Sequence, residues 1–70
     1  MREIEIRGDM IRLGQLLKLA NLASGGGDIH AILADGVVVN ADPEDRRGRQ
    51  LHHGDVVEVM GETLRVISLP

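Results

Sequence analysis

The stretch LGQLLKLANLASGGGDIHAILADGVVVN, residues 13–40, decides the fold that we predict for this sequence. Its first half carries leucines at the spacing of an amphipathic helix. Gln15 and Lys18 fall on the opposite, polar side of that helix. We therefore predict a helix over Ile11–Leu22, with Asp9 as the residue that caps its start.

The glycine-rich segment Ser24–Gly27 interrupts the helical pattern, and a second helix is predicted over Asp28–Asp35. If Gly25 is the N-cap, Asp28 stands at the third helical position, where its carboxylate can accept a hydrogen bond from the free amide of the cap. Gly36 follows the helix and can adopt the left-handed conformation that ends many helices. We expect two short helices at an angle to one another.

Strand patterns lie on both sides of the helical pair. Arg2–Arg7 alternates charged and apolar residues, with Ile4 and Ile6 on one face, as in a half-buried strand. Beyond the helices, Asn40–Pro43 has the composition of a turn. Further strands are predicted over Val37–Val39, Val56–Met60 and Thr63–Ser68, the last two joined by a hairpin turn at Gly61-Glu62. These elements predict a compact α+β fold in one domain over residues 1–70.

Composition excludes several classes of protein. The chain has 70 residues and no cysteine, which removes disulfides, a thiolate nucleophile and sulfur-ligated zinc. It has no aromatic residue, so it cannot stack unpaired bases on Phe, Tyr or Trp as common RNA-reading modules do. The sequence shows neither a signal peptide nor an apolar run of membrane-spanning length. We expect a cytoplasmic protein that acts through its surface.

Positive charge is concentrated in DRRGRQLHHGD, residues 45–55, although the net charge of the chain is −3. Guanidinium groups bind phosphate oxygens in pairs and stay charged, and Gly48 lets a ligand approach the backbone, so the segment is a candidate phosphate-binding surface. The alternative is a solvated loop whose arginines are neutralised by Asp42, Glu44, Asp45 and Asp55. Both interpretations are compatible with the composition.

Other chemistry has weaker support in the sequence. His52 and His53 would point to opposite faces of an extended segment, so a shared metal ion is not expected. The triple glycine is not followed by Lys-Ser or Lys-Thr, and Asp28 would repel a phosphate, which argues against a nucleotide-binding loop. The two serines, Ser24 and Ser68, lack a base and an orienting group. We predict no metal, no cofactor and no enzymatic activity.

The order of these motifs resembles the S4 RNA-binding domain, in particular small bacterial proteins that consist of little else. The matching segments are LGQLLKL at 13–19, GGGD at 25–28, ILADGVVVN at 32–40, RRGRQL at 46–51 and GDVV at 54–57. The resemblance implies the αL fold, in which two short helices pack on a small, bent, mostly antiparallel sheet. It also implies that the helices and neighbouring basic loops face structured RNA, without catalysis by the domain itself.

The sequence departs from the family pattern at a few positions. Ile29-His30 stands where Ala-Lys is common, Asn40-Ala41 replaces the usual Asn-Gly, and Gln50 occupies a position that is often Lys or Arg. The competing hypothesis is a protein-interaction module that kept the scaffold and lost part of its RNA affinity. The acidic net charge, His30 and Gln50 favour this alternative.

The resemblance and the charge pattern together predict a set of RNA-binding residues: Arg12, Gln15, Lys18, His30, Arg46, Arg47 and Arg49. The expected partner is ribosomal or transfer RNA, within a ribosome or another ribonucleoprotein, recognised by phosphate and shape contacts rather than by base sequence. We expect a monomer or a weak homodimer that pairs through the edge of the strand around Glu3–Ile6.

Overall fold

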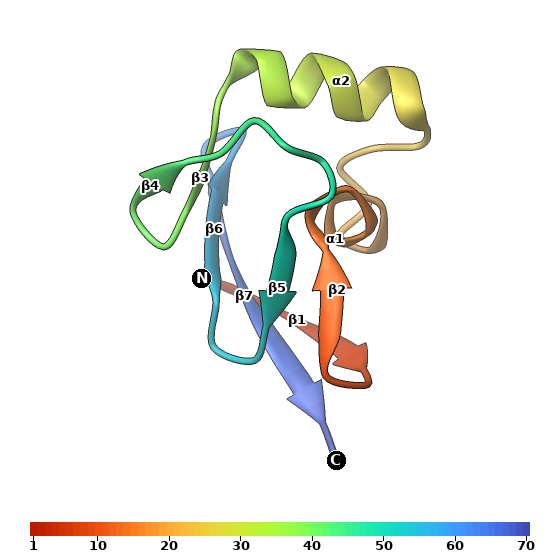
Figure 1. Ribbon diagram of the computed structural model, residues 1–70, viewed down its shortest axis with the longest axis vertical. Coiled ribbons are helices and arrows are strands. Elements are labelled where there is room, and N and C mark those ends of the chain that lie inside the picture. The colour runs from red at the N-terminus through yellow and green to blue at the C-terminus, as the bar shows by residue number, and fades with distance from the viewer.

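The computed structural model describes residues 1–70, which form two helices and seven strands. In chain order these are β1 (Arg2–Arg7), β2 (Met10–Arg12), α1 (Leu13–Leu19), α2 (Gly26–Asp35), β3 (Val37–Val39), β4 (Asp42–Pro43), β5 (Gln50–His52), β6 (Val56–Val59) and β7 (Glu62–Leu69). Five strands form one sheet in the order β1-β7-β6-β3-β4, and β2 pairs with β5 in a second sheet. α2 crosses one end of the molecule, and α1 lies beneath its first turns (Figure 1).

The direction of the strands confirms the predicted α+β fold with a mostly antiparallel sheet. β1 and β7 run parallel, whereas every other strand pair is antiparallel. β1 occupies one edge of the larger sheet, so the segment proposed for homodimer pairing lies at a sheet edge, and the pairing itself stays a prediction. No helix combines the length and the apolar character needed to span a membrane.

A single cluster of 16 buried apolar residues joins both helices to both sheets. In β1 the buried residues are Ile4 and Ile6, as their alternation predicts, and in β7 they are Leu64 and Val66. Leu16 of α1 is fully buried in the same cluster. Aliphatic side chains alone therefore build the core, and the charged residues that alternate with them in β1 and β7 remain at the surface.

The first helix begins later than the predicted Ile11–Leu22 helix. Ile11 lies in β2 and pairs with Leu51 of β5, so its backbone is extended and α1 begins at Leu13. The N-cap is the last residue of β2, and the prediction that Asp9 caps the helix is wrong. A long-range strand pairing has overridden the helical periodicity at this end.

The same helix also ends earlier than predicted, at Leu19. Asn21 adopts a φ of 65°, and its amide donates to the carbonyl of Lys18 at 3.0 Å. The amide of Leu22 donates to the carbonyl of Leu17 at 2.9 Å. These two bonds form a Schellman motif, in which a residue in the left-handed conformation turns the chain away from the helix axis.

The second helix begins at Gly26, two residues before the predicted start at Asp28. Gly25 is its N-cap, as predicted, but the Asp28 carboxylate accepts hydrogen bonds from the hydroxyl and amide of Ser24, at 2.5 and 3.0 Å, rather than from the cap amide. These bonds lower the pKa of Asp28. Gly36 ends the helix with a φ of 117° and a ψ of 123°, so the positive φ is confirmed while the ψ is extended rather than left-handed helical.

Two hairpin turns contain residues with positive φ. Asn40-Ala41 joins β3 to β4 with φ values of 50° and 71°, and Met60-Gly61 joins β6 to β7 with values of 52° and 75°. Two-residue turns of this kind match the twist of the strands and favour Asn and Gly. The predicted turn at Gly61-Glu62 is shifted by one residue, because Glu62 already pairs with Val59.

Candidate nucleic-acid interface

The segment Glu44–Arg49 between β4 and β5, here called the arginine loop, is fixed to the start of α1 (Figure 1). The amide of Leu13 donates to the carbonyl of Arg49 at 2.8 Å, and the amide of Gly14 donates to the carbonyl of Arg47 at 2.9 Å. The first amides of a helix have no partner within the helix, so the arginine loop satisfies two of them. These two bonds hold the arginine loop against the start of α1.

A buried carboxylate, that of Glu44, organises the side chains of the arginine loop. It accepts hydrogen bonds from the backbone amides of Asp45 and Arg46, both at 3.0 Å. It also accepts from Nε and Nη2 of Arg46, at 3.0 and 3.2 Å, and from Nη1 of Arg49, at 2.9 Å. The Glu44 side chain is 5% exposed, so a burial that would otherwise be unfavourable is compensated by two cations.

These contacts determine the charge state of the loop. The hydrogen bonds from Arg46 first, and from Arg49 second, lower the pKa of Glu44 to about 2, and the same pairing raises the pKa of Arg46. Glu44 is therefore ionised at neutral pH and shares its charge with both arginines. The expected neutralisation by acids is confirmed for this pair of arginines, with Glu44 as the acid, since Asp42 and Asp45 make no ion pair.

Arg47 is directed away from Glu44 and toward the helices. It lines a small hollow of about 140 Å³ together with Arg12, Gly14, Gln15, Lys18, Ile29 and Gly48, here called the basic hollow. A Cβ placed on Gly26 would lie 3.7 Å from Nη1 of Arg47, which locates this guanidinium beside the start of α2. Arg12, Lys18 and Arg47 are exposed, and none of them pairs with a carboxylate.

Local contacts hold the rim of the basic hollow in place. The backbone amide of Arg12 donates to Oε1 of Gln15 at 3.1 Å, which caps α1 and fixes the amide side chain near the rim. Nη1 of Arg12 reaches the carbonyl of Gly48 at 3.4 Å. Lys18 lies one helical turn beyond Gln15 on the same exposed side of α1. Three free cations from β2, α1 and the arginine loop therefore surround one depression.

The remaining predicted residues lie outside the basic hollow. Arg46 and Arg49 line an adjoining open hollow of about 580 Å³ with Gly48, Gln50 and His52. Gly48 lines both hollows, so the two form one continuous surface. His30 is exposed on α2 and lines neither hollow. The seven predicted residues are thus divided into a group of four, a neighbouring pair and an isolated histidine.

Sequence reasoning missed the structural role of the backbone at this site. The carbonyls of Arg47 and Arg49 hold α1, and Gly14 lies against the backbone of Arg47, where an added Cβ would meet the carbonyl oxygen at 3.5 Å, an ordinary van der Waals distance. The sequence carries no signal for these contacts, because backbone carbonyls, which every residue has, make them. The structure contains no cluster of three or more His, Cys, Asp or Glu side chains placed to hold a metal ion.

Comparison with known proteins identifies the class to which this arrangement belongs. The family model described as "S4 domain" matches residues 4–67, so the chain belongs to the S4 domain family, as the motif order predicted. Among curated proteins, the chain is similar to the "Probable ribosome maturation protein RlbA" of Bacillus subtilis (strain 168). The two are 49% identical over 59 residues, which is 83% of each chain.

Proposed function

We propose that this protein binds structured RNA, ribosomal or transfer RNA, through the basic hollow and has no catalytic activity. The observation that carries the proposal is the convergence of three unpaired cations, Arg12, Lys18 and Arg47, from separate segments of the chain onto one depression. Membership in the S4 domain family supports RNA as the ligand. The similarity to the Bacillus ribosome maturation protein supports a role connected with ribosome maturation.

The geometry favours phosphate contacts over recognition of a small molecule. The basic hollow, at about 140 Å³, is smaller than pockets that enclose drug-sized ligands, which occupy roughly 300–1,000 Å³. A single phosphate needs only a few convergent donors, and two guanidinium groups and one ammonium supply them. The chain has no aromatic side chain on which unpaired bases could stack. Backbone shape, rather than base identity, is therefore the feature that this surface would recognise.

Arg46 and Arg49 have a secondary role in this proposal. Because they share Glu44, the three groups together carry one net positive charge rather than two. The side chain of Arg46 is 72% exposed and can still approach a phosphate next to the basic hollow. His30, which lines neither hollow, contributes little to binding.

A titration of transfer RNA and ribosomal RNA with matched charge variants tests the proposal. Lys18→Ala with Arg47→Ala should weaken binding at low salt by at least about tenfold, because two phosphate contacts are lost. Arg7→Ala with Arg65→Ala removes the same charge from exposed positions outside the basic hollow and should leave the affinity nearly unchanged. Equal losses in both variants, or no binding of either RNA to the unmodified protein, would contradict the proposal.

A further inference from the structure

Met60 has a backbone conformation and a solvent exposure that are both unfavourable for the stability of the protein. It is the first residue of the turn between β6 and β7, and its φ of 52° lies in the left-handed region, where Asn and Gly are preferred. Its side chain is large and apolar, yet the residue is 56% exposed. A strained backbone position and an exposed apolar side chain are both local costs, and a conformational outlier of this kind often marks a functional position.

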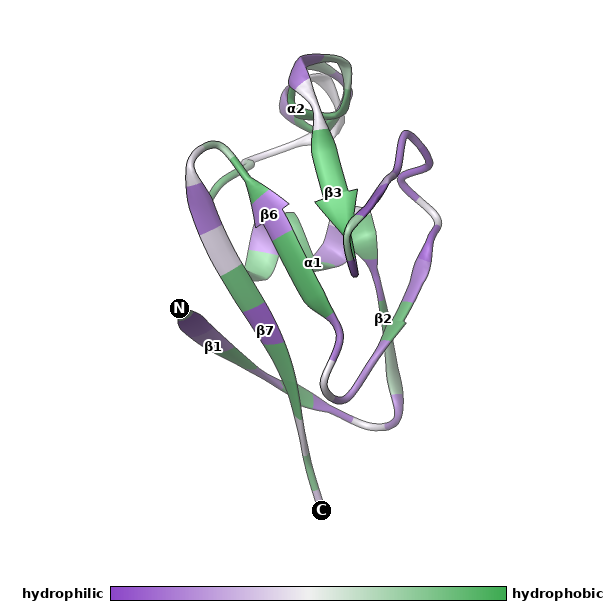
Figure 2. Ribbon diagram, turned by 90° about the vertical axis from the view of Figure 1, so that its left-hand side faces the viewer, coloured by the Kyte–Doolittle hydropathy of each residue, from purple (hydrophilic) through white to green (hydrophobic).

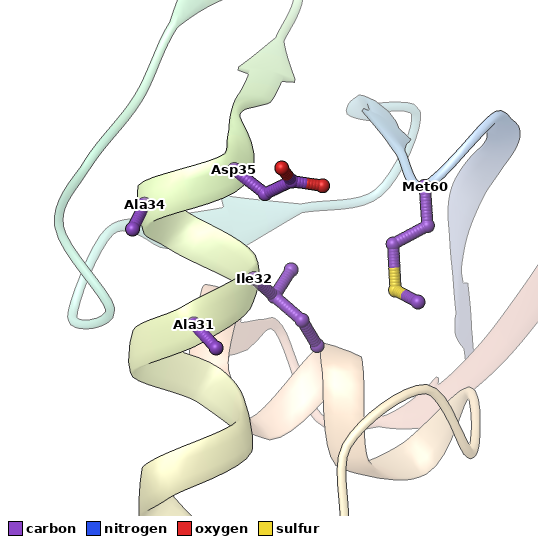
Figure 3. Close-up of a pocket in the computed structure, with 5 residues that line it drawn as sticks. All are labelled: Ala31, Ile32, Ala34, Asp35 and Met60. Carbon is purple, nitrogen blue, oxygen red and sulfur yellow. The ribbon is translucent and has the colours of Figure 1, made fainter.

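The Met60 side chain forms one wall of a shallow hollow whose other wall is the C-terminal half of α2, here called the α2 hollow. It has a volume of about 550 Å³ and is lined by Ala31, Ile32, Ala34, Asp35 and Met60, four of which are apolar. Figure 3 shows Met60 and Ile32 extending toward the same gap from the two sides. The alanines are short, so the helix surface stays low and leaves room for an apolar side chain from another molecule.

Asp35 is a second residue in this hollow whose position is unfavourable for stability. It is the last residue of α2, and a carboxylate at the C-terminal end of a helix opposes the helix dipole. No cation lies in the last turn of α2, and Asp35 makes no ion pair. Two residues that are locally unfavourable for stability, Met60 and Asp35, therefore line one hollow.

The charges around the α2 hollow have one sign. An adjoining hollow of about 300 Å³ shares Met60 and is lined by Glu58 and Glu62, and no Lys or Arg lines either hollow. Glu62 pairs with Arg2 at 3.0 Å, whereas Glu58 has no cationic partner. An apolar depression bordered by the unpaired carboxylates of Asp35 and Glu58 repels RNA and also repels a second copy of the same surface.

We propose that the α2 hollow docks a basic protein segment in which an aliphatic side chain, as an anchor, is flanked by lysines or arginines. The anchor would pack between Met60 and Ile32, and the flanking cations would pair with Asp35 and Glu58. The turn between β6 and β7 and the arginine loop lie on opposite sides of α2 (Figure 2). The α2 hollow is therefore separate from the basic hollow, and the two share no lining residue.

The test is a chemical-shift titration of the isotopically labelled full chain with a short synthetic peptide that repeats Lys-Arg-Leu. The amides of Ala31, Asp35 and Gly61 should shift with a Kd of about 1 mM or lower. Matched peptides with Leu replaced by Ser, or with Lys and Arg replaced by Glu, should cause shifts at least roughly fivefold smaller at the same concentration.

Two variants separate binding from stability. Met60→Asn places a residue that tolerates positive φ in the turn, and Asp35→Asn removes the unfavourable charge from the helix end, so both should keep or raise the melting temperature. Both variants should nevertheless bind the Lys-Arg-Leu peptide with an affinity that is lower by roughly fivefold or more. Shifts confined to the arginine loop, equal binding of the acidic peptide, unchanged affinity in both variants, or RNA-induced shifts around Met60 would overturn the proposal.

Discussion

The salt dependence of RNA binding follows from the number of free cations around the basic hollow. Arg12, Lys18 and Arg47 each lack an acidic partner, so each can neutralise one phosphate. Each neutralised phosphate contributes about −0.7 to −0.9 to the slope of log affinity against log salt concentration, so three contacts predict a slope of about −2 to −3. Raising the salt from about 50 to about 200 mM should then weaken binding roughly 20- to 40-fold. Replacing Lys18 and Arg47 with Ala leaves one contact, a slope of about −0.7 to −0.9 and only about a threefold loss.

Fluorescence anisotropy with one labelled RNA hairpin, repeated at four or more salt concentrations, measures these slopes. Arg46 and Arg49 share Glu44 in both proteins, so they shift both slopes alike and leave the difference intact. The Arg7→Ala and Arg65→Ala double variant serves as the control and should keep the steep slope. Equal slopes for the unmodified protein and the Lys18/Arg47 variant would refute the assignment of these two cations as phosphate contacts.

The remaining predictions concern the loop, a turn and the core. The pKa of Glu44 in the folded protein, about 2, is below the ordinary value of 4.5, so Glu44 stabilises the fold above pH 4.5 and loses this contribution as the pH falls toward 2. The free energy of unfolding of Glu44→Gln should therefore fall less steeply with pH in that window. An identical acid profile for both proteins would contradict the role of the ion pairs. Ala41→Gly should raise the free energy of unfolding by about 0.5–1 kcal/mol and the melting temperature by about 2–8 °C, since Ala41 has a φ of 71°; a lower melting temperature would show that the turn is not strained. Leu16→Ala should cost about 2–5 kcal/mol in urea unfolding because Leu16 is fully buried, whereas Leu19→Ala on the same helix, at a residue 54% exposed, should change stability by less than about 0.5 kcal/mol.

Local patterns predicted the elements of this fold better than their ends. The alternation of Ile4 and Ile6, the N-cap role of Gly25 and the positive φ of Gly36 depend on interactions within a few residues, and all three were predictable. The start of α1 was not, because it depends on the pairing of Ile11 with Leu51, forty residues away. Short strands such as β4 and β5 likewise exist only because a partner strand aligns them.

The candidate site was predictable in its composition and not in its arrangement. The cluster of arginines and the polar side of α1 are visible in the sequence, and so is the possibility that nearby acids neutralise the cluster. Which arginine pairs with Glu44 depends on side-chain direction within an irregular loop, and no periodicity encodes that direction. Arg47 differs from Arg46 and Arg49 in the direction of its side chain: its guanidinium lies beside the start of α2 and does not bond to Glu44.

A chemical-shift map of the labelled protein with an RNA hairpin tests most directly whether the basic hollow is the RNA-binding surface. The amides of Gly14, Gln15 and Gly48, which line the hollow, should shift together as RNA is added. Those of Met60 and Gly61, in the turn on the other side of α2, should stay in place. Shifts centred on that turn or on β1, with none at Gly14 and Gly48, would contradict the proposed interface.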